Sequence, residues 1–311
     1  MGIGSSRPPL ALIAGPTASG KSALGLELAR RSGGVIINAD SAQVYRDAPI
    51  VSAAPTRAET KLADHRLYGI LDGSRPCSAA DWAAMAREEI DAVHAEGLIA
   101  ILVGGTGLYL RTLLDGIAPV PPIDPKVREQ VRAAATADNR QRLAELDPKA
   151  AQRLEPSDTT RIARALEVVL STGRPLAEWQ ARRQGGIGGS VDLRPLVLLP
   201  PRDWLYRRCD ERFERMIADG AIGEVEALLK RKLDPALPVM RAIGVPEIAA
   251  FLRRQMSYEE MIAAGRQATR RYAKRQYTWF AHQPPGDWPR LTKPLEGEAI
   301  SEALALLGAK G

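Results

Sequence analysis

Apolar runs of strand length alternate with helical patterns over the first third of the chain. The runs that predict strands are residues 10–14, 35–38 and 98–103. Residues 21–31 have helical character, and so does the stretch from Ser78 to His94, where Asp81 completes a capping box with Ser78. Continuous apolar strands separated by helices are typical of a parallel sheet that is covered on both faces. We therefore expect an α/β core.

The pattern changes in the middle of the chain. A proline-rich crossing at residues 118–125 leads into helical periodicity up to about residue 183, and a glycine-rich stretch follows at residues 185–190. Residues 196–199 predict another strand, and the remainder is mainly helical. Two linkers around a helical block indicate an insertion. We expect a discontinuous core, residues 1–118 and 193–311, interrupted by a helical insertion domain at residues 119–192.

Composition narrows the class of protein only a little. The chain of 311 residues is 45% hydrophobic and 26% charged, which is typical of a packed globular protein. Its formal charge is +6, and most of the cations are arginines, which favours phosphate or nucleic-acid ligands. A GC-rich genome would enrich arginine equally well, so composition alone does not decide between these explanations.

Other features bear on location. The two cysteines, Cys77 and Cys209, form neither a disulfide framework nor a zinc site, which favours a reducing cytoplasm. No apolar run is long enough to cross a bilayer, and we expect no membrane association. Residues 1–6 formally match a myristoylation pattern, but no polybasic or second lipid signal accompanies it.

A phosphate-binding motif follows the first predicted strand. The run Gly15-Pro16-Thr17-Ala18-Ser19-Gly20-Lys21-Ser22 matches the complete P-loop pattern between a strand and a helix. Its backbone N–H groups and the start of the following helix would surround a phosphate. Lys21 would reach the outer phosphate, and the Ser22 hydroxyl would bind Mg²⁺. The motif indicates a diphosphate or triphosphate with magnesium, within a P-loop NTPase-like fold, without showing that ATP is the ligand.

The usual partner of an ATPase P-loop is missing. An ATPase carries a metal-binding Asp at the end of another strand, whereas the strand at residues 98–103 ends in Gly104-Gly105-Thr106-Gly107. The nearest acid is Asp40, which follows the strand at residues 35–38. Because strand C-termini meet at one crevice of an open α/β sheet, Asp40 and Thr106 should lie near the P-loop. Asp40 could bind metal, act as a general base, or cap the segment at residues 41–45.

Seven segments in chain order resemble one family, the bacterial tRNA dimethylallyltransferases, which are isopentenyltransferases that modify adenosine 37. The segments are the P-loop, Asp40-Ser41-Ala42-Gln43-Val44-Tyr45-Arg46, Gly104-Gly105-Thr106-Gly107-Leu108-Tyr109, residues 161–168, Arg212-Phe213 with Met216, Arg241-Ala242-Ile243-Gly244, and residues 269–279. They span both the core and the insertion, and together they are far more specific than a P-loop alone.

The resemblance implies an activity and roles for individual residues. The P-loop would hold dimethylallyl diphosphate, Asp40 would be the general base on the adenine N6 amine, Thr106 would lie beside base and donor, and Arg212 would neutralise the departing diphosphate. The partner would be the anticodon stem-loop of tRNA, and we expect a monomer. The residues expected to contact tRNA are Asp40, Ser41, Ala42, Gln43, Thr106, Arg128, Thr160, Arg161, Ile162, Ala163, Arg164, Arg241, Ala242, Ile243, Gly244, Val245 and Pro246.

Two departures from the family pattern affect local tRNA contacts. Relatives commonly carry Lys where this chain has Ala54, and often an aromatic residue where it has Val245-Pro246. Further along the chain, Arg266, Arg270 and Lys274 form a stripe at helical spacing, which suits either an RNA backbone or a solvated helix face. Of the nearby aromatic residues, Tyr272, Tyr277, Trp279 and Phe280, we expect core packing rather than base stacking.

Three other functions are compatible with parts of the sequence. A P-loop kinase for small molecules could use the insertion as a lid, but the basic C-terminal helix would then have no role. A prenyltransferase acting on free adenylate would need no tRNA surface. A non-catalytic RNA-binding protein would not need Lys21, Ser22 and Asp40 to be intact.

Overall fold

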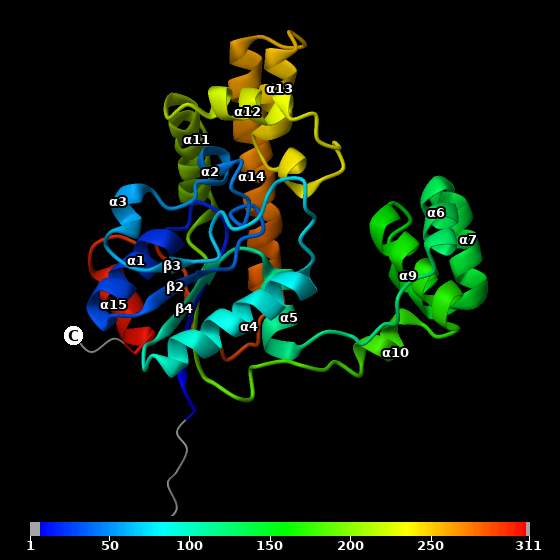
Figure 1. The fold of residues 1–311 in the computed structure, drawn as a ribbon, viewed down its shortest axis with the longest axis horizontal. Coiled ribbons are helices and arrows are strands. Elements are labelled where there is room, and N and C mark those ends of the chain that lie inside the picture. Colours follow the sequence, from blue (N-terminus) through cyan, green and yellow to red (C-terminus); the bar gives the residue numbers. More distant parts are fainter. Residues whose placement is uncertain (1–6, 309–311) are drawn as a thin grey trace, which may run out of the picture. The chain divides into compact units, whose positions relative to one another are not determined.

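The computed structural model describes residues 7–308, so the myristoylation pattern at residues 1–6 lies outside the described residues. The chain divides into two compact units (Figure 1). One unit comprises residues 1–113 and 188–311, and the other comprises residues 114–187. These limits lie a few residues before the expected domain boundaries.

A parallel sheet is the centre of the first unit, as the sequence predicts. Its order is β3-β2-β4-β1-β5-β6, and every pairing is parallel. The strands are β1 (Pro9–Ala14), β2 (Val35–Asn38), β3 (His65–Arg66), β4 (Ala100–Gly104), β5 (Asp192–Leu198) and β6 (Arg290–Leu291). The predicted α/β class and the strands at residues 10–14 and 35–38 are therefore confirmed.

Apolar side chains project from both faces of the sheet. Ala11, Ile13, Ile101 and Leu196 pack on one face against α1 (Lys21–Ser32) and α15 (Glu298–Leu306). On the other face lies α4 (Ala79–Ala95), which contacts β2 and β4 and buries Trp82 completely. Burial on both faces accounts for the continuous apolar strands of the sequence.

The helices of the first unit lie around this sheet and beyond its C-terminal edge (Figure 1). They are α1 (Lys21–Ser32), α2 (Pro49–Ser52), α3 (Arg57–Thr60), α4 (Ala79–Ala95), most of α5 (Gly107–Asp115), α11 (Arg202–Ala218), α12 (Ala221–Lys230), the 3₁₀ helix η1 (Pro238–Arg241), α13 (Val245–Leu252), α14 (Tyr258–His282) and α15 (Glu298–Leu306). The long α14 packs along α11, where Gly265 lies against the buried Phe213 ring. The predicted capping box of Ser78 and Asp81 starts α4.

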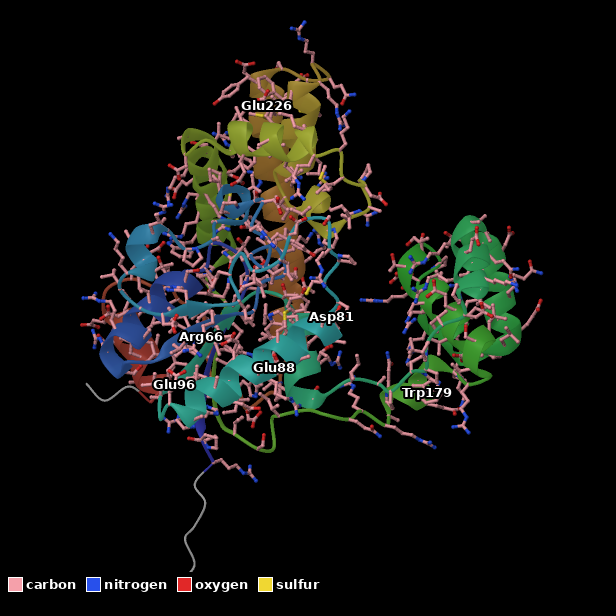
Figure 2. All side chains as sticks on the ribbon, in the orientation of Figure 1. Arg66, Asp81, Glu88, Glu96, Trp179 and Glu226 are labelled. Atoms are coloured by element: carbon pink, nitrogen blue, oxygen red, sulfur yellow. The ribbon has the colours of Figure 1, made fainter. Side chains whose placement is uncertain are left out.

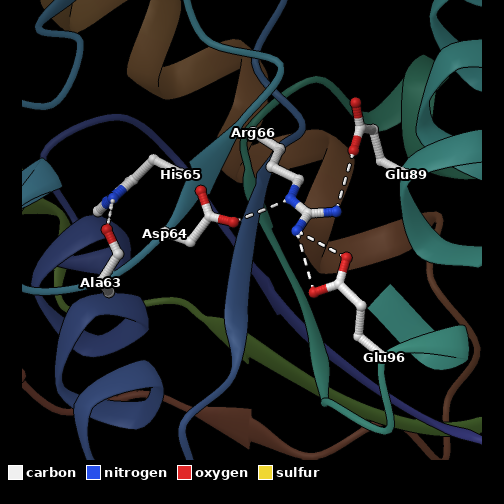
Figure 3. Close-up of polar contacts among 6 residues, drawn as sticks. All are labelled: Ala63, Asp64, His65, Arg66, Glu89 and Glu96. Carbon is white, nitrogen blue, oxygen red and sulfur yellow. Dashed lines mark hydrogen bonds and ion pairs between the residues drawn. The ribbon is translucent and has the colours of Figure 1, made fainter. Parts of the chain in front are cut away.

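An ion-pair network secures the edge strand β3. Arg66 binds Asp64 at 2.9 Å, Glu89 at 3.4 Å and Glu96 at 3.2 Å, which joins β3 to α4 (Figure 3). Glu89 lies within α4 and Glu96 caps its C-terminus. Figure 2 labels Arg66 of β3 together with Glu88 of α4 and Glu96, the cap of that helix. A strand of two residues has no detectable sequence pattern, and these tertiary contacts explain why it forms here.

The second unit is entirely helical where the structure describes it, apart from one isolated bridge between Ile117 and Gln184. Its helices are α6 (Pro125–Ala133), α7 (Thr136–Leu146), α8 (Pro148–Arg153), α9 (Thr159–Thr172) and α10 (Leu176–Gln180). Val131, Leu143, Ile162 and Leu166 form its own core. The helical pattern predicted for this region is confirmed.

Candidate active site

The P-loop connects β1 to α1 at the C-terminal edge of the sheet. Gly15 has φ +150°, and a Cβ there would lie 2.5 Å from the carbonyl oxygen of Leu198. Gly20 has φ +98° at the start of α1. Ala18, also at positive φ, is held by a hydrogen bond that Arg208 donates to its carbonyl at 3.1 Å. Local backbone geometry thus requires the glycines of the motif.

Lys21 is the buried cation of this loop. Only 9% of the residue is exposed, and its ammonium donates to the Pro16 carbonyl at 2.7 Å. Burial lowers the pKa of Lys21 to about 8, and the charge of Asp40 opposes this shift. A phosphate oxygen would supply the compensating charge that the buried ammonium lacks.

Two hydroxyls complete the loop. Ser22 is exposed in the first turn of α1. Ser19 is 1% exposed, and its Oγ has no hydrogen-bond partner within the described chain. Buried polar atoms are normally paired, so an unpaired hydroxyl in a P-loop favours a bound phosphate or water at this point.

Asp40 lies directly after β2 in a tight turn. Its backbone N–H donates to Asn38 Oδ1 at 2.8 Å, and its own Oδ1 accepts from the Ala42 N–H at 3.0 Å. The Trp82 indole donates a hydrogen bond to the Asn38 carbonyl at 2.9 Å, which holds the end of β2 in place. Residues 41–44 form bends and turns, and Tyr45 forms a bridge with Leu71, so no helix follows Asp40. The hydrogen bond from the Ala42 N–H shows that the Asp40 carboxylate does cap the start of this segment.

Thr106, after β4, joins the same turn. Its Oγ1 accepts from the Ser41 N–H at 2.9 Å and donates to Ser41 Oγ at 3.2 Å. Its backbone N–H donates to the Ala39 carbonyl at 3.2 Å. The ends of β2 and β4 are therefore linked directly, as their position at one edge of the sheet predicts.

Arg212 approaches this edge from α11. Its guanidinium donates to the Ser52 carbonyl at 3.0 Å, and Gln43 donates to the same carbonyl at 3.1 Å. Burial lowers the pKa of Arg212, and the nearby Asp40 charge opposes that shift. Lys21, Arg212 and Asp40 thus form one cluster of interacting charges around the P-loop.

A cavity of about 170 Å³ adjoins this cluster. It is lined by Thr17, Asp40, Ser41, Ala42, Val51, Ser52, Arg212, Met216, Pro238, Arg241, Ala242, Ile243, Thr269 and Tyr272. Polar and charged groups stand at the P-loop and Asp40, whereas Val51, Met216 and Ile243 supply apolar walls. Such a cavity suits a small organic group joined to a phosphate.

Several expected tRNA-contacting residues have other roles in the first unit. Gln43 is buried and donates to the carbonyls of Ser52 and Ala53, so its amide is engaged within the protein. Val245 is 1% exposed within α13, which Gly244 caps and in which Pro246 is an early residue. The side chains of Gln43 and Val245 are therefore unavailable to RNA. Arg241, Ala242 and Ile243 do line the cavity.

Of the residues in the second unit that were expected to contact tRNA, some are exposed and others are buried. Arg128, Thr160 and Arg161 are exposed. Ala163 packs against the helical core, and Ile162 is fully buried in it, so the Ile162 side chain cannot meet RNA. Arg164 lies 3.6 Å from the buried Glu167 carboxylate.

The basic stripe on α14 is partly neutralised. Arg266 pairs with Glu214, and Arg270 binds Asp210 at 2.8 Å, which ties α14 to α11. The stripe is therefore neither a bare RNA surface nor a solvated face over its first two positions. Tyr272 is partly buried and lines the cavity, whereas Phe280 is fully buried as expected.

Sequence reasoning missed the wall of the cavity. Val51, Ser52, Thr269 and Tyr272 lie there. Thr269 and Tyr272 belong to the segment at residues 269–279 that resembles the family, but no role in a cavity was predicted for them. Ala54, the departure from the family pattern, lines a small second cavity with Ser22 and Tyr68. A lysine at that position would have placed a cation beside Ser22.

A complete P-loop, with a carboxylate and a partly buried arginine converging on one cavity, defines an α/β enzyme that handles a substrate carrying two or more phosphates. The family model described as IPP transferase matches residues 43–283, and the chain belongs to this family. The resemblance of the sequence motifs to this group of enzymes is thereby confirmed.

Individual relatives agree with this assignment over nearly the whole chain. A tRNA dimethylallyltransferase of Sphingopyxis alaskensis is 61% identical over 94% of this chain and 95% of its own. One of Erythrobacter litoralis is 59% identical over 92% of both. Among solved structures, a tRNA isopentenylpyrophosphate transferase of Bacillus halodurans superposes with TM-score 0.71 at 31% identity, covering 97% of this chain and 96% of that one. A eukaryotic dimethylallyltransferase acting on tRNA gives TM-score 0.81 at 27% identity, with coverages of 96% and 78%.

Proposed function

We propose that this protein transfers a dimethylallyl group from dimethylallyl diphosphate to N6 of adenosine 37 in the anticodon loop of tRNA. The observation that carries the proposal is the cavity shared by the P-loop, Asp40 and Arg212. Family membership and relatives named tRNA dimethylallyltransferase support the same reaction.

The diphosphate of the donor would bind in the P-loop. Lys21 and Arg212 would meet the negative charge that builds up as the allylic C–O bond breaks and diphosphate departs. The apolar wall of Val51, Met216 and Ile243 would surround the dimethylallyl group. Because β4 ends without a carboxylate, nothing on this strand corresponds to the metal-binding acid of an ATPase.

Magnesium fits the residues present. The exposed Ser22 hydroxyl would be its protein ligand, and no cluster of three or more His, Cys, Asp or Glu suited to a metal occurs within residues 7–308. Mg²⁺ commonly binds through few protein ligands together with phosphate oxygens and water. When bound, it would neutralise charge on the diphosphate.

Asp40 would act on the acceptor. As the adenine N6 amine forms its new bond to the allylic carbon, the N–H proton would pass to the Asp40 carboxylate. The Asx-type contact with Ala42 N–H and the link between Thr106 and Ser41 hold this carboxylate at the cavity. One C–N bond forms, one C–O bond breaks, and diphosphate and a proton are the other products.

Recognition of tRNA would involve both units. The target adenosine must leave the stacked anticodon loop to present its amine to the cavity, which costs a few kcal/mol. Exposed cations such as Arg128 and Arg161 would contribute phosphate contacts that offset this cost. We propose that the helical unit, predicted as residues 119–192, serves as a tRNA-binding domain.

Location and assembly stay predictions. No helix of residues 7–308 has the length and apolar character needed to span a membrane. We propose that the protein works in the cytoplasm as a monomer, and sedimentation of the purified protein would measure its assembly.

Replacement of Asp40 tests the proposed chemistry. Asp40→Ala should keep tRNA and donor binding but lower the single-turnover rate of prenyl transfer by about 10²-fold or more, because the proton acceptor is lost. Circular dichroism would confirm that the variant is folded. A rate within a few-fold of the unmodified protein would show that Asp40 is not the base.

A further inference from the structure

Gln276 on α14 connects two parts of the active site that lie far apart in the sequence. Its side-chain oxygen accepts from the Thr17 N–H of the P-loop at 2.8 Å. Its amide nitrogen donates to the Gly105 carbonyl, after β4, at 2.8 Å. The residue is only 6% exposed, and both hydrogen bonds are buried. One amide therefore joins the phosphate loop to the turn that carries Thr106.

Few side chains could make this connection. It requires an acceptor facing Thr17 and a donor facing Gly105, and the primary amide supplies one of each. The fit on the Gly105 side is close, because a Cβ at Gly105 would lie 2.3 Å from the amide nitrogen of Gln276. Glycine at position 105 and glutamine at position 276 are thus required together.

The two connected segments hold the two reacting ends of the proposed site. The Gly15–Ser22 loop would hold the leaving diphosphate, and Thr106 binds Ser41 beside Asp40, the proposed base. The same face of α14 presents Thr269 and Tyr272 to the cavity, two turns and one turn before Gln276, respectively. Bond formation between two held reactants depends on their separation, and misplacement by about 1 Å can cost about 10²-fold in rate.

We propose that Gln276 is a positioning residue that sets the separation between the donor diphosphate site and the Asp40–Thr106 turn. This inference rests on the proposed function. It predicts that loss of the double hydrogen bond lowers the rate of prenyl transfer at saturating substrates, with little effect on the affinity for donor.

Two near-isosteric variants test the role. Gln276→Met removes both hydrogen bonds at all pH values. Gln276→Glu keeps an acceptor for Thr17 but, when ionised, turns an oxygen without hydrogen toward the Gly105 carbonyl. When protonated, the carboxylic acid again offers one acceptor and one donor. Burial beside a carbonyl disfavours the charged form and raises the pKa of this carboxyl above its usual range.

The measurement is the single-turnover rate of transfer to tRNA between pH 6 and pH 8, expressed relative to the unmodified protein. Lys21, Asp40 and Arg212 are the nearby charged groups in every variant, and the ratio removes any pH dependence that they share. We expect Gln276→Met to be about tenfold or more slower at both pH values. Gln276→Glu should be similarly slow at pH 8 and recover at least threefold toward the unmodified rate at pH 6. Dimethylallyl diphosphate affinity should change less than threefold.

A rate for Gln276→Met within threefold of the unmodified protein would overturn the proposal. So would a Gln276→Glu deficit that is constant from pH 6 to pH 8 in a folded protein, because a purely structural defect has no reason to follow this proton. Lys21→Ala distinguishes failure of the wider assignment. If that variant retains full affinity for dimethylallyl diphosphate, the donor is not held by the P-loop, whatever the Gln276 variants show.

Discussion

At the scale of single residues, the site depends on burial of charges that compensate one another. Lys21 and Arg212 are desolvated, and Asp40 opposes the resulting fall in the pKa of both. The sequence motif identifies Lys21, and family resemblance identifies Asp40 and Arg212. Tyr272 and Gln276 lie in the segment at residues 269–279 that resembles the family, but their roles could not be predicted, since a tyrosine and a glutamine on a helix carry no local signal of what they meet across the fold.

The lowered pKa of Lys21, about 8, predicts how donor binding depends on pH. A bound diphosphate favours the ammonium form and raises this pKa, so binding above pH 8 requires uptake of a proton. Below about pH 7.5 Lys21 is already protonated, so its ionisation should not make the affinity for dimethylallyl diphosphate depend on pH. Above pH 8 this affinity should fall, approaching a tenfold loss per pH unit. Calorimetric titration from pH 7 to pH 10 measures this dependence.

Lys21→Arg is the matched control, because a guanidinium keeps its charge throughout that range. The donor affinity of this variant should not fall between pH 7 and pH 10 through loss of the charge at position 21. A flat affinity of the unmodified protein from pH 7 to pH 10 would contradict a role for the Lys21 ammonium.

At the scale of elements, strands buried on both faces were predictable and tertiary connections were not. β2 matches its predicted limits because Val35, Ile36 and Ile37 leave little alternative. β5 begins four residues before the predicted strand, because its first half, which includes Pro195, pairs with β1 on one side only. A proline is tolerated at such an edge but conceals the strand in the sequence.

The short helix α2 shows another connection of this kind. Glu224 of α12 accepts from the backbone N–H groups of Ile50 and Val51 at 2.7 and 2.9 Å. These groups begin α2, whose Ser52 carbonyl receives Arg212. Burial raises the pKa of Glu224, and these two hydrogen bonds oppose the rise. Glu224 therefore acts on the active site through α2.

Glu224→Ala should destabilise the protein by about 1–3 kcal/mol, the usual cost of leaving buried donors unpaired. It should also slow prenyl transfer, because Ser52 and Val51 lose their support. Denaturant unfolding and single-turnover rates measure the two effects. Glu226→Ala on the same helix is the control: Glu226 is exposed (Figure 2), forms a surface ion pair with Lys230 at 3.2 Å, and should contribute less than about 1 kcal/mol. Equal effects of the two substitutions would contradict the role of Glu224.

At the scale of the whole molecule, two units with separate cores share one chain. The first contains every residue of the cavity, and the second presents exposed cations on α6 and α9. Prolines before the insertion and glycines after it made its existence predictable. The contact surface of the insertion was less predictable, because Ile162 lies in a motif shared with relatives and yet is buried in the helical core. Resemblance of a motif therefore does not separate packing residues from contact residues.

In the proposed reaction, the P-loop holds a prenyl diphosphate for transfer to tRNA rather than a nucleotide for hydrolysis. The most direct measurement is transfer of label from dimethylallyl diphosphate to purified tRNA or to AMP, with and without ATP. We predict transfer to tRNA with Mg²⁺ and no nucleotide, at most competitive inhibition by added ATP, and negligible transfer to AMP. A strict requirement for ATP, or transfer to AMP as efficient as transfer to tRNA, would contradict the claim.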